Sequence, residues 1–93
     1  MPGSNVFKIL YVRSVIDHDI PSLSADIRKR VKKAIETRLT VDPIDYGKPL
    51  QYSLKGNRRL RVGNYRVIYT IDVEKHIVII TAISHRKNIY TNA

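Results

Sequence analysis

The pair Gly63-Asn64 constrains this chain more than any other feature, because it is the kind of pair that closes a tight β-hairpin. It stands between Arg58–Val62 and Tyr65–Asp72, two runs with the β-branched and aromatic residues typical of strands. With Gly63 and Asn64 as the loop, the register of the two strands follows by counting. The residues that then face one another are Val62 and Tyr65, Arg61 and Arg66, Leu60 and Val67, and Arg59 and Ile68.

One face of this hairpin is apolar, because residues directly across a ladder share a face and the faces alternate along each strand. We expect helices to pack on that face and to leave the other face uncovered. The apolar face holds Leu60, Val62, Tyr65, Val67 and Tyr69.

The other face carries Arg59, Arg61 and Arg66. Arg61 faces Arg66 directly, and like charges across a ladder destabilise a sheet. Local conflicts of this kind tend to mark functional positions. A phosphate between the two guanidinium groups would make the interaction favourable, because each planar fork binds phosphate through paired hydrogen bonds. The alternative is that both heads turn into solvent, where screening makes their repulsion small.

Ahead of the hairpin, the pattern predicts one strand and two helices. Residues 7–12 are β-branched and aromatic, which favours a strand, and residues 14–20 favour a short helix that ends at Pro21. Ser24 is a good N-cap for a second helix, and Asp26 suits its first turn. We expect this helix to end at Asp42-Pro43, because a residue before proline avoids the helical region. Its apolar stripe recurs at helical spacing and consists of Ile27, Val31, Ala34, Ile35 and Leu39.

The remaining segments complete an α+β fold. Residues 45–49 favour a loop, residues 73–75 a turn and residues 76–84 a third strand. The predicted order is an N-terminal strand, a two-helix hairpin and a three-stranded antiparallel meander, with the helices on one face of the sheet. A length of 93 residues fits a single domain, in which residues 1–5 form a loose tail.

Charge indicates the class of partner. The chain has 17 Lys and Arg against 8 Asp and Glu, a formal net charge of +9 with a sequence pI of about 10.1. Such an excess attracts polyanions, of which nucleic acid comes first, ahead of an acidic protein or an anionic membrane. The alternative is a small protein that is basic for no functional reason.

Composition excludes several chemistries. The chain has no cysteine, which excludes disulfides, thiolate nucleophiles and Cys-based zinc sites. No histidines and carboxylates stand at metal-ligand spacing, so we expect no metal. The longest apolar run, residues 77–80, is too short to span a bilayer, and the first residues do not resemble a signal peptide. We therefore expect a cytoplasmic protein that does not enter membranes.

Two further groups of residues are candidates for function. Near the C-terminus, His85 and Tyr90 could exchange protons, Tyr90 could also stack on a base, and Arg86 and Lys87 add charge. On the second helix, four cations form a basic surface that could contact phosphates without regard to sequence. Those four are Arg28, Lys29, Lys32 and Lys33. A structural role for His85 or Tyr90, and an ordinary solvated face for the lysines, are the alternatives.

Two segments resemble the signatures of RelE/ParE toxins. The first runs from Leu54-Lys55-Gly56 through Arg59-Leu60-Arg61-Val62-Gly63-Asn64-Tyr65-Arg66-Val67-Ile68-Tyr69, and the second is Ile83-Ser84-His85-Arg86-Lys87-Asn88-Ile89-Tyr90. Upstream, residues 19–23 and 27–31 resemble the helical hairpin of the same superfamily, so the likeness covers nearly all of residues 6–90.

The resemblance implies a microbial RNase-like fold and a cognate antitoxin that neutralises the protein. In the RelE branch it also implies cleavage of messenger RNA in the ribosomal A site, without a metal or any other cofactor. There the message's own 2′-hydroxyl attacks the next phosphate, which leaves a cyclic phosphate and a 5′-hydroxyl.

Site residues follow from the resemblance position by position. Arg66 matches the sheet arginine that holds the scissile phosphate, and Arg86 matches a second phosphate-binding arginine. Tyr90 matches the tyrosine that stacks on the substrate base and assists proton transfer, and His85 stands where some relatives carry a histidine. Arg59 and Arg61 occupy positions where the best-known RelE has lysines. The spacing from Arg86 to Tyr90 is shorter than in that toxin, so His85 and Tyr90 remain rivals for the general base.

The expected catalytic set is therefore Arg61, Arg66, His85, Arg86 and Tyr90. The expected substrate contacts are Arg59, Lys87, Arg28, Lys29, Lys32 and Lys33. Two other functions stay open at this point. One is a ParE-like gyrase poison without RNase chemistry, and the other is an attenuated toxin that survives as a binding module.

Overall fold

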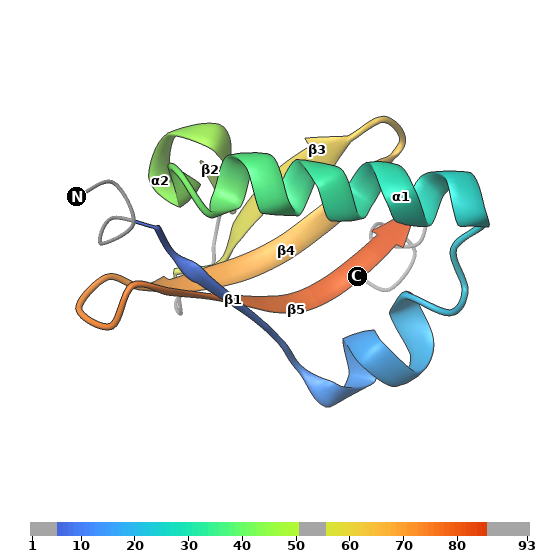
Figure 1. Cartoon of the computed structure of the whole chain (residues 1–93), viewed down its shortest axis with the longest axis horizontal. Coiled ribbons are helices and arrows are strands. Elements are labelled where there is room, and N and C mark those ends of the chain that lie inside the picture. The colour runs from blue at the N-terminus through green and yellow to red at the C-terminus, as the bar shows by residue number, and fades with distance from the viewer. Residues whose placement is uncertain (1–5, 51–55, 86–93) are drawn as a thin grey trace.

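A computed structural model describes residues 6–50 and 56–85 (Figure 1). Five strands form one sheet in the order β1-β5-β4-β3-β2. The strands are β1 (Lys8–Tyr11), β2 (Lys48–Pro49), β3 (Arg58–Val62), β4 (Tyr65–Asp72) and β5 (Ile77–His85). The helical segments are η2 (Val15–Asp19), α1 (Ala25–Ala34), η3 (Ile35–Leu39) and α2 (Pro43–Tyr46). The predicted α+β class and order of elements are confirmed, with β2 and α2 as additions.

The central hairpin forms as predicted. β3 and β4 have the predicted bounds, and their register pairs Val62 with Tyr65 and Arg61 with Arg66. Gly63 opens the turn with a positive φ of 59°, a conformation that glycine adopts without strain. β5 adds to β4 in antiparallel fashion, and β1 lies parallel to β5 at the edge of the sheet.

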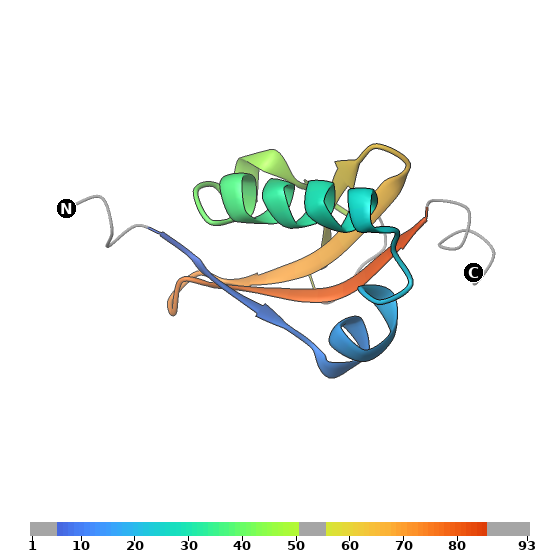
Figure 2. The ribbon, with the colours of Figure 1, turned by 45° about the vertical axis from the view of Figure 1, so that its right-hand side comes forward.

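The long helix, α1 continued by η3, crosses one face of the sheet (Figures 1 and 2). Its N-cap is Ser24, whose hydroxyl accepts a hydrogen bond from the Ile27 backbone N–H at 3.3 Å. Most of the predicted apolar stripe is buried, while Ile27 is half-buried. Together with strand residues it forms the core, whose members are Val15, Leu23, Val31, Ala34, Ile35, Leu39, Leu60, Val67, Tyr69, Val78, Ile80 and Ile83.

The loop predicted for residues 45–49 is wrong. Asp42 caps a short helix by accepting a hydrogen bond from the Asp45 N–H at 3.1 Å, with Pro43 as its first residue. Residues 48–49 then pair with β3 as β2. The buried Tyr69 hydroxyl donates to the Pro43 carbonyl at 2.6 Å, and Arg58 donates to the Ile44 and Gly47 carbonyls. These long-range contacts hold the segment against β3 and β4, which local propensity could not show.

β5 contains a bulge at Thr81. Ile68 pairs with Ala82 and Tyr69 pairs with Ile80, so Thr81 has no partner of its own in the ladder. The Thr81 hydroxyl donates to the Ile68 carbonyl at 3.2 Å. Burial follows the bulge: Val78 and Ile80 are buried before it and Ile83 after it, an odd step in an otherwise alternating strand.

Beyond the end of β1, the η2 segment continues along the edge of β5. β1 pairs with β5 only as far as Ile80, and the Ile83 N–H donates instead to the Asp19 carboxylate at 2.9 Å. Asp19 thus satisfies a backbone donor at an edge that no strand covers. Within the described ranges, no helix is long and apolar enough to cross a membrane.

Candidate functional site

The opposed arginines and Ser84 form a row across three strands. Arg61 on β3 faces Arg66 on β4, and Arg66 faces Ser84 on β5. Directly opposed side chains share a face, so the three project from the face away from α1. Arg59 belongs to the same face, two residues along β3. The fold therefore brings the three predicted sheet arginines to one side.

The sequence pattern led us to expect an uncovered face, but this face is partly covered. Arg61 is exposed and Arg59 is half-buried, but Arg66 is only 5% exposed. Arg66 is the one buried charged side chain in residues 6–50 and 56–85. Burying a charge requires compensation by hydrogen bonds or opposite charge, so a buried arginine in a sheet is a candidate for function. Low local dielectric also strengthens its attraction for an anion.

His85 lies away from this row, contrary to expectation. It faces Tyr65, and the two rings make an edge-to-face contact with centroids 5.1 Å apart. Tyr65 and Val62 project from the helix side of the hairpin, so the register places His85 on the other face from Arg66. The cause is the bulge at Thr81. Alternation counted from Ile80 without a bulge would have put His85 on the arginine face.

Three other predicted site residues cannot be placed. Arg86, Lys87 and Tyr90 lie outside the described residues. Their roles remain predictions that rest on the resemblance.

The basic surface predicted on the helix is divided between two flanks. Arg28 and Lys32 border an apolar hollow of about 310 Å³ beside Leu23, where the Arg28 guanidinium donates to the Leu23 carbonyl at 3.1 Å. Lys33 points to the opposite flank, over the edge of β3. Lys29 is exposed and borders neither hollow.

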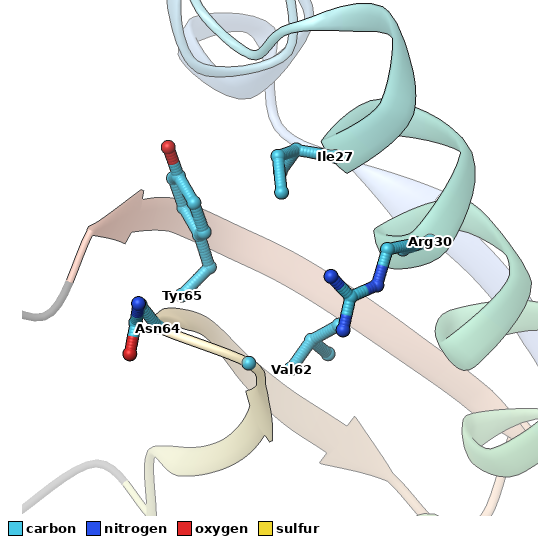
Figure 3. A pocket seen from close by; sticks show the side chains of 6 residues that line it. Ile27, Arg30, Val62, Asn64 and Tyr65 are labelled. Carbon is cyan, nitrogen blue, oxygen red and sulfur yellow. The ribbon is translucent and has the colours of Figure 1, made fainter.

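The flank beside β3 also holds Arg30, a cation that the sequence pattern did not single out. Arg30 reaches from α1 toward the hairpin, over a hollow of about 300 Å³ that Ile27, Val62 and Tyr65 also line (Figure 3). A Cβ placed on Gly63 would lie 3.6 Å from the Arg30 guanidinium. The helical positions of Arg30 and Lys33 are visible in the sequence, but their nearness to β3 depends on how α1 crosses the sheet.

Tyr69 is not a candidate for proton transfer. Burial raises the pKa of its phenol above the ordinary value, although nearby Arg58 acts in the opposite direction. The hydroxyl is already used as a donor to the Pro43 carbonyl. In the part of the chain that the structure describes, no three His, Asp or Glu side chains gather in a way that could hold a metal ion.

Comparison with known proteins places the chain in a family. Residues 13–90 match the model of the ParE toxin of type II toxin–antitoxin systems, parDE. The chain belongs to this family. As a member of the ParE family, it shares the RelE/ParE superfamily fold with solved RelE toxins.

The relatives of this ParE-family chain include RelE toxins. It is 42% identical over 52 residues to toxin RelG of Mycobacterium tuberculosis, which covers 56% of this chain and 60% of the relative. The chain therefore matches less than two thirds of that relative's length. Its structure resembles the toxin–antitoxin complex RelBE2 of Mycobacterium tuberculosis with a TM-score of 0.80 and 30% identity, covering 87% of this chain and 92% of the other. The isolated E. coli RelE toxin has the same fold at 20% identity, with a TM-score of 0.67 over 92% of this chain and 93% of that one.

Proposed function

We propose that this ParE-family protein is the toxin of a type II pair and acts as an endoribonuclease that cleaves messenger RNA in the ribosomal A site. The observation that carries the proposal is the row of Arg61 and Arg66 on one face of the sheet, with Arg66 buried. Like charges opposed in this way are unfavourable for folding alone. A phosphodiester between them makes the arrangement favourable.

The proposed reaction is an attack of the message's 2′-hydroxyl on the adjacent phosphate. The P–O bond to the 2′-oxygen forms while the bond to the 5′-oxygen breaks. A base takes the proton of the 2′-hydroxyl and the leaving 5′-oxygen takes up a proton, so a cyclic phosphate and a 5′-hydroxyl remain. The pentacoordinate phosphorane through which the reaction passes carries extra negative charge. Arg61 and Arg66 would hold its oxygens, since arginine keeps its charge and binds phosphate through a planar fork. In this scheme charge stabilisation comes from the protein alone, without a metal or other cofactor.

Proton transfer is assigned by position and by resemblance. The register sets His85 against Tyr65 on the face opposite Arg66, which speaks against His85 as the base for the 2′-hydroxyl. Tyr90, outside the described residues, is the other candidate and takes that role in this proposal. Arg86 would join the sheet arginines on the phosphate, with Lys87 and the helix cations as weaker contacts to RNA.

The proposed partners are a cognate antitoxin, messenger RNA and the ribosome, met in the cytoplasm. Three solved relatives are complexes with RelB-type antitoxins: RelBE2 of Mycobacterium tuberculosis, RelE-RelB of Pyrococcus horikoshii and RelB-RelE of Methanococcus jannaschii. A net charge of +9 suits both an acidic antitoxin and RNA.

The second candidate function is inhibition of DNA gyrase. It is favoured by the family model, which is that of the ParE toxin. The two candidate functions differ in whether they need the Arg61 side chain. A nuclease needs this side chain at the phosphate, whereas a gyrase poison has no reacting phosphate for it to hold.

Primer extension on translated message separates the two candidates. We expect the wild-type protein to create new 5′ ends in the message on programmed ribosomes, and to leave gyrase supercoiling unchanged. Arg61→Ala should slow cleavage by about tenfold to a hundredfold, because the exposed side chain acts on charge in the transition state. Lys75→Ala, which removes one positive charge from the exposed turn between β4 and β5, is the matched control and should cleave as wild type. Intact message together with blocked supercoiling would refute the nuclease and support the gyrase poison.

A further inference from the structure

A line of hollows runs between the long helix and the edge of β3. The first, of about 300 Å³, lies beside Arg30 and the hairpin tip (Figure 3). The second, of about 390 Å³, shares Arg30, Val62 and Gly63 with the first. The third, of about 250 Å³, shares Arg38 and Arg61 with the second and extends to α2 and β2. Because neighbours share walls, the three form one groove, here called the β3-edge groove.

The β3-edge groove is positively charged along its length. Its cations come from α1, η3, β2 and β3, and the residues that line it include no carboxylate. None of these cations forms an ion pair with another residue of the described ranges, where the only salt bridge is Arg13–Asp17. Six like charges gather along this edge, although the register places Lys48, Arg59 and Arg61 on the face away from α1. Like charges repel one another, so the groove favours an anion. The six are Arg30, Lys33, Arg38, Lys48, Arg59 and Arg61.

An exposed aromatic ring lies among these charges. Tyr46, at the end of α2, is 54% exposed and lines the third hollow with Arg38 and Lys48. It makes no hydrogen bond through its hydroxyl in the described part of the chain, unlike Tyr69 in the core. An exposed ring between cations is the arrangement by which proteins stack a base while holding the phosphates on either side.

We propose that the β3-edge groove binds single-stranded RNA, with Arg30, Lys33 and Arg38 on the phosphates and Tyr46 stacked on a base. The proposal rests on the proposed function, because it extends the path of the cleaved message from the Arg61–Arg66 row around the edge of β3 and along the helix. From Arg30 to Arg38 the helix rises roughly 12 Å, at about 1.5 Å per residue. That length matches three to four stacked nucleotides at about 3.4 Å each.

An acidic protein segment fits the groove less well. Tight protein interfaces depend on large apolar or aromatic side chains that enter pockets at their centre. The middle hollow offers four cations among its eight lining residues, with Ala34 and Val62 as its only apolar side chains. An RNA strand needs no such pocket, since phosphates and one exposed base use the cations and the ring.

Binding of a strand that cannot be cleaved tests the inference separately from the nuclease. The probe is a short fluorescein-labelled 2′-O-methyl oligonucleotide, which lacks the 2′-hydroxyl needed for cleavage. Its affinity is measured by fluorescence anisotropy with the full chain, between about 50 and 200 mM salt. Each variant replaces an exposed side chain, and its melting temperature confirms that it is folded.

The two kinds of contact predict different losses. Arg38→Ala should weaken binding about tenfold and reduce the slope of log affinity against log salt by about 0.7, the value for one phosphate contact on a single strand. Tyr46→Ala should weaken binding at least about fivefold without changing that slope, and Tyr46→Phe should bind as wild type because the ring is retained. Lys75→Ala, which removes one exposed positive charge in the turn between β4 and β5, outside the groove, is the matched control for Arg38→Ala and should stay within about twofold of wild type.

Two results would overturn the inference. If Arg38→Ala and Tyr46→Ala both bind like Lys75→Ala, the groove is not the site. Loss on Arg38→Ala with no loss on Tyr46→Ala would show a general anion surface of the kind that an acidic protein uses. The nuclease and the groove can fail separately. If wild type binds the probe, Tyr46→Ala loses that binding and wild type leaves translated message intact, the nuclease proposal is refuted and the groove proposal stands.

Discussion

At the scale of single residues, Gly47 shows how a side chain distant in the sequence can require glycine at a position. A Cβ on this residue would lie 1.7 Å from the Tyr69 hydroxyl and 2.9 Å from the Arg59 carbonyl. The backbone at Gly47 has a φ of −103°, which any residue adopts, so the requirement for glycine comes from space alone. The close approach allows Tyr69 to reach the Pro43 carbonyl across the sheet.

Gly47→Ala should therefore destabilise the protein by about 1–3 kcal/mol, as overpacking of a filled site does. In a chain of this size each kcal/mol lowers the melting temperature by roughly 4–8 °C, which thermal denaturation by circular dichroism can measure. Combining it with Tyr69→Phe removes the closest clashing atom, so the double variant should lose less stability than the sum of the single changes. An unchanged melting temperature for Gly47→Ala would contradict the packing described here.

The same scale shows where sequence reasoning was sufficient. The opposition of Arg61 and Arg66 could be predicted because a two-residue turn fixes the register of both strands. The burial of Arg66 and the contact between Gly47 and Tyr69 could not, since both depend on segments distant in sequence.

At the scale of elements, the bulge in β5 decides which face its last residues take. The strand was predicted within one residue at each end, but no glycine or proline marks Thr81 as the point where alternation shifts. His85 consequently pairs with Tyr65 instead of joining Arg66. Likewise β2 forms because it pairs with β3, and α2 is held by the hydrogen bond from Tyr69 to Pro43. These are tertiary contacts, which the sequence of residues 45–49 alone does not reveal.

The edge of β5 gives a prediction about Asp19. Asp19→Ala leaves the partly buried Ile83 N–H without its acceptor, which should destabilise the protein by about 1–3 kcal/mol. Asp19→Asn keeps an oxygen that can accept the bond and should lose less. Urea denaturation measures the stability, and hydrogen exchange at the Ile83 amide reports the contact itself.

The neighbouring carboxylate supplies the control for that experiment. Asp17 forms an exposed ion pair with Arg13 at 3.2 Å, and such pairs contribute only about 0–1 kcal/mol. Asp17→Ala should therefore leave the Ile83 amide protected. Equal effects of Asp17→Ala and Asp19→Ala would argue against a specific role for Asp19 at this edge.

At the scale of the whole molecule, the sheet separates two surfaces. The row of Arg61 and Arg66 lies on the face away from α1, while His85 and the wall of the β3-edge groove formed by α1 lie on the helix side. Arg61, on β3 near its edge, belongs to the row and also borders the groove. The net charge of +9 indicated a polyanion from composition alone. The division of this positive charge between the two surfaces follows from the way α1 crosses the sheet.

The central claim is that the buried arginine on the far face of the sheet carries cleavage and the histidine on the helix side does not. Single-turnover cleavage of message on programmed ribosomes by Arg66→Ala and His85→Ala tests it most directly. We predict that Arg66→Ala lowers the rate at least about a hundredfold, as loss of a charge contact in the transition state does, while His85→Ala stays within about threefold of wild type. Wild-type cleavage by a folded Arg66→Ala variant would contradict the claim.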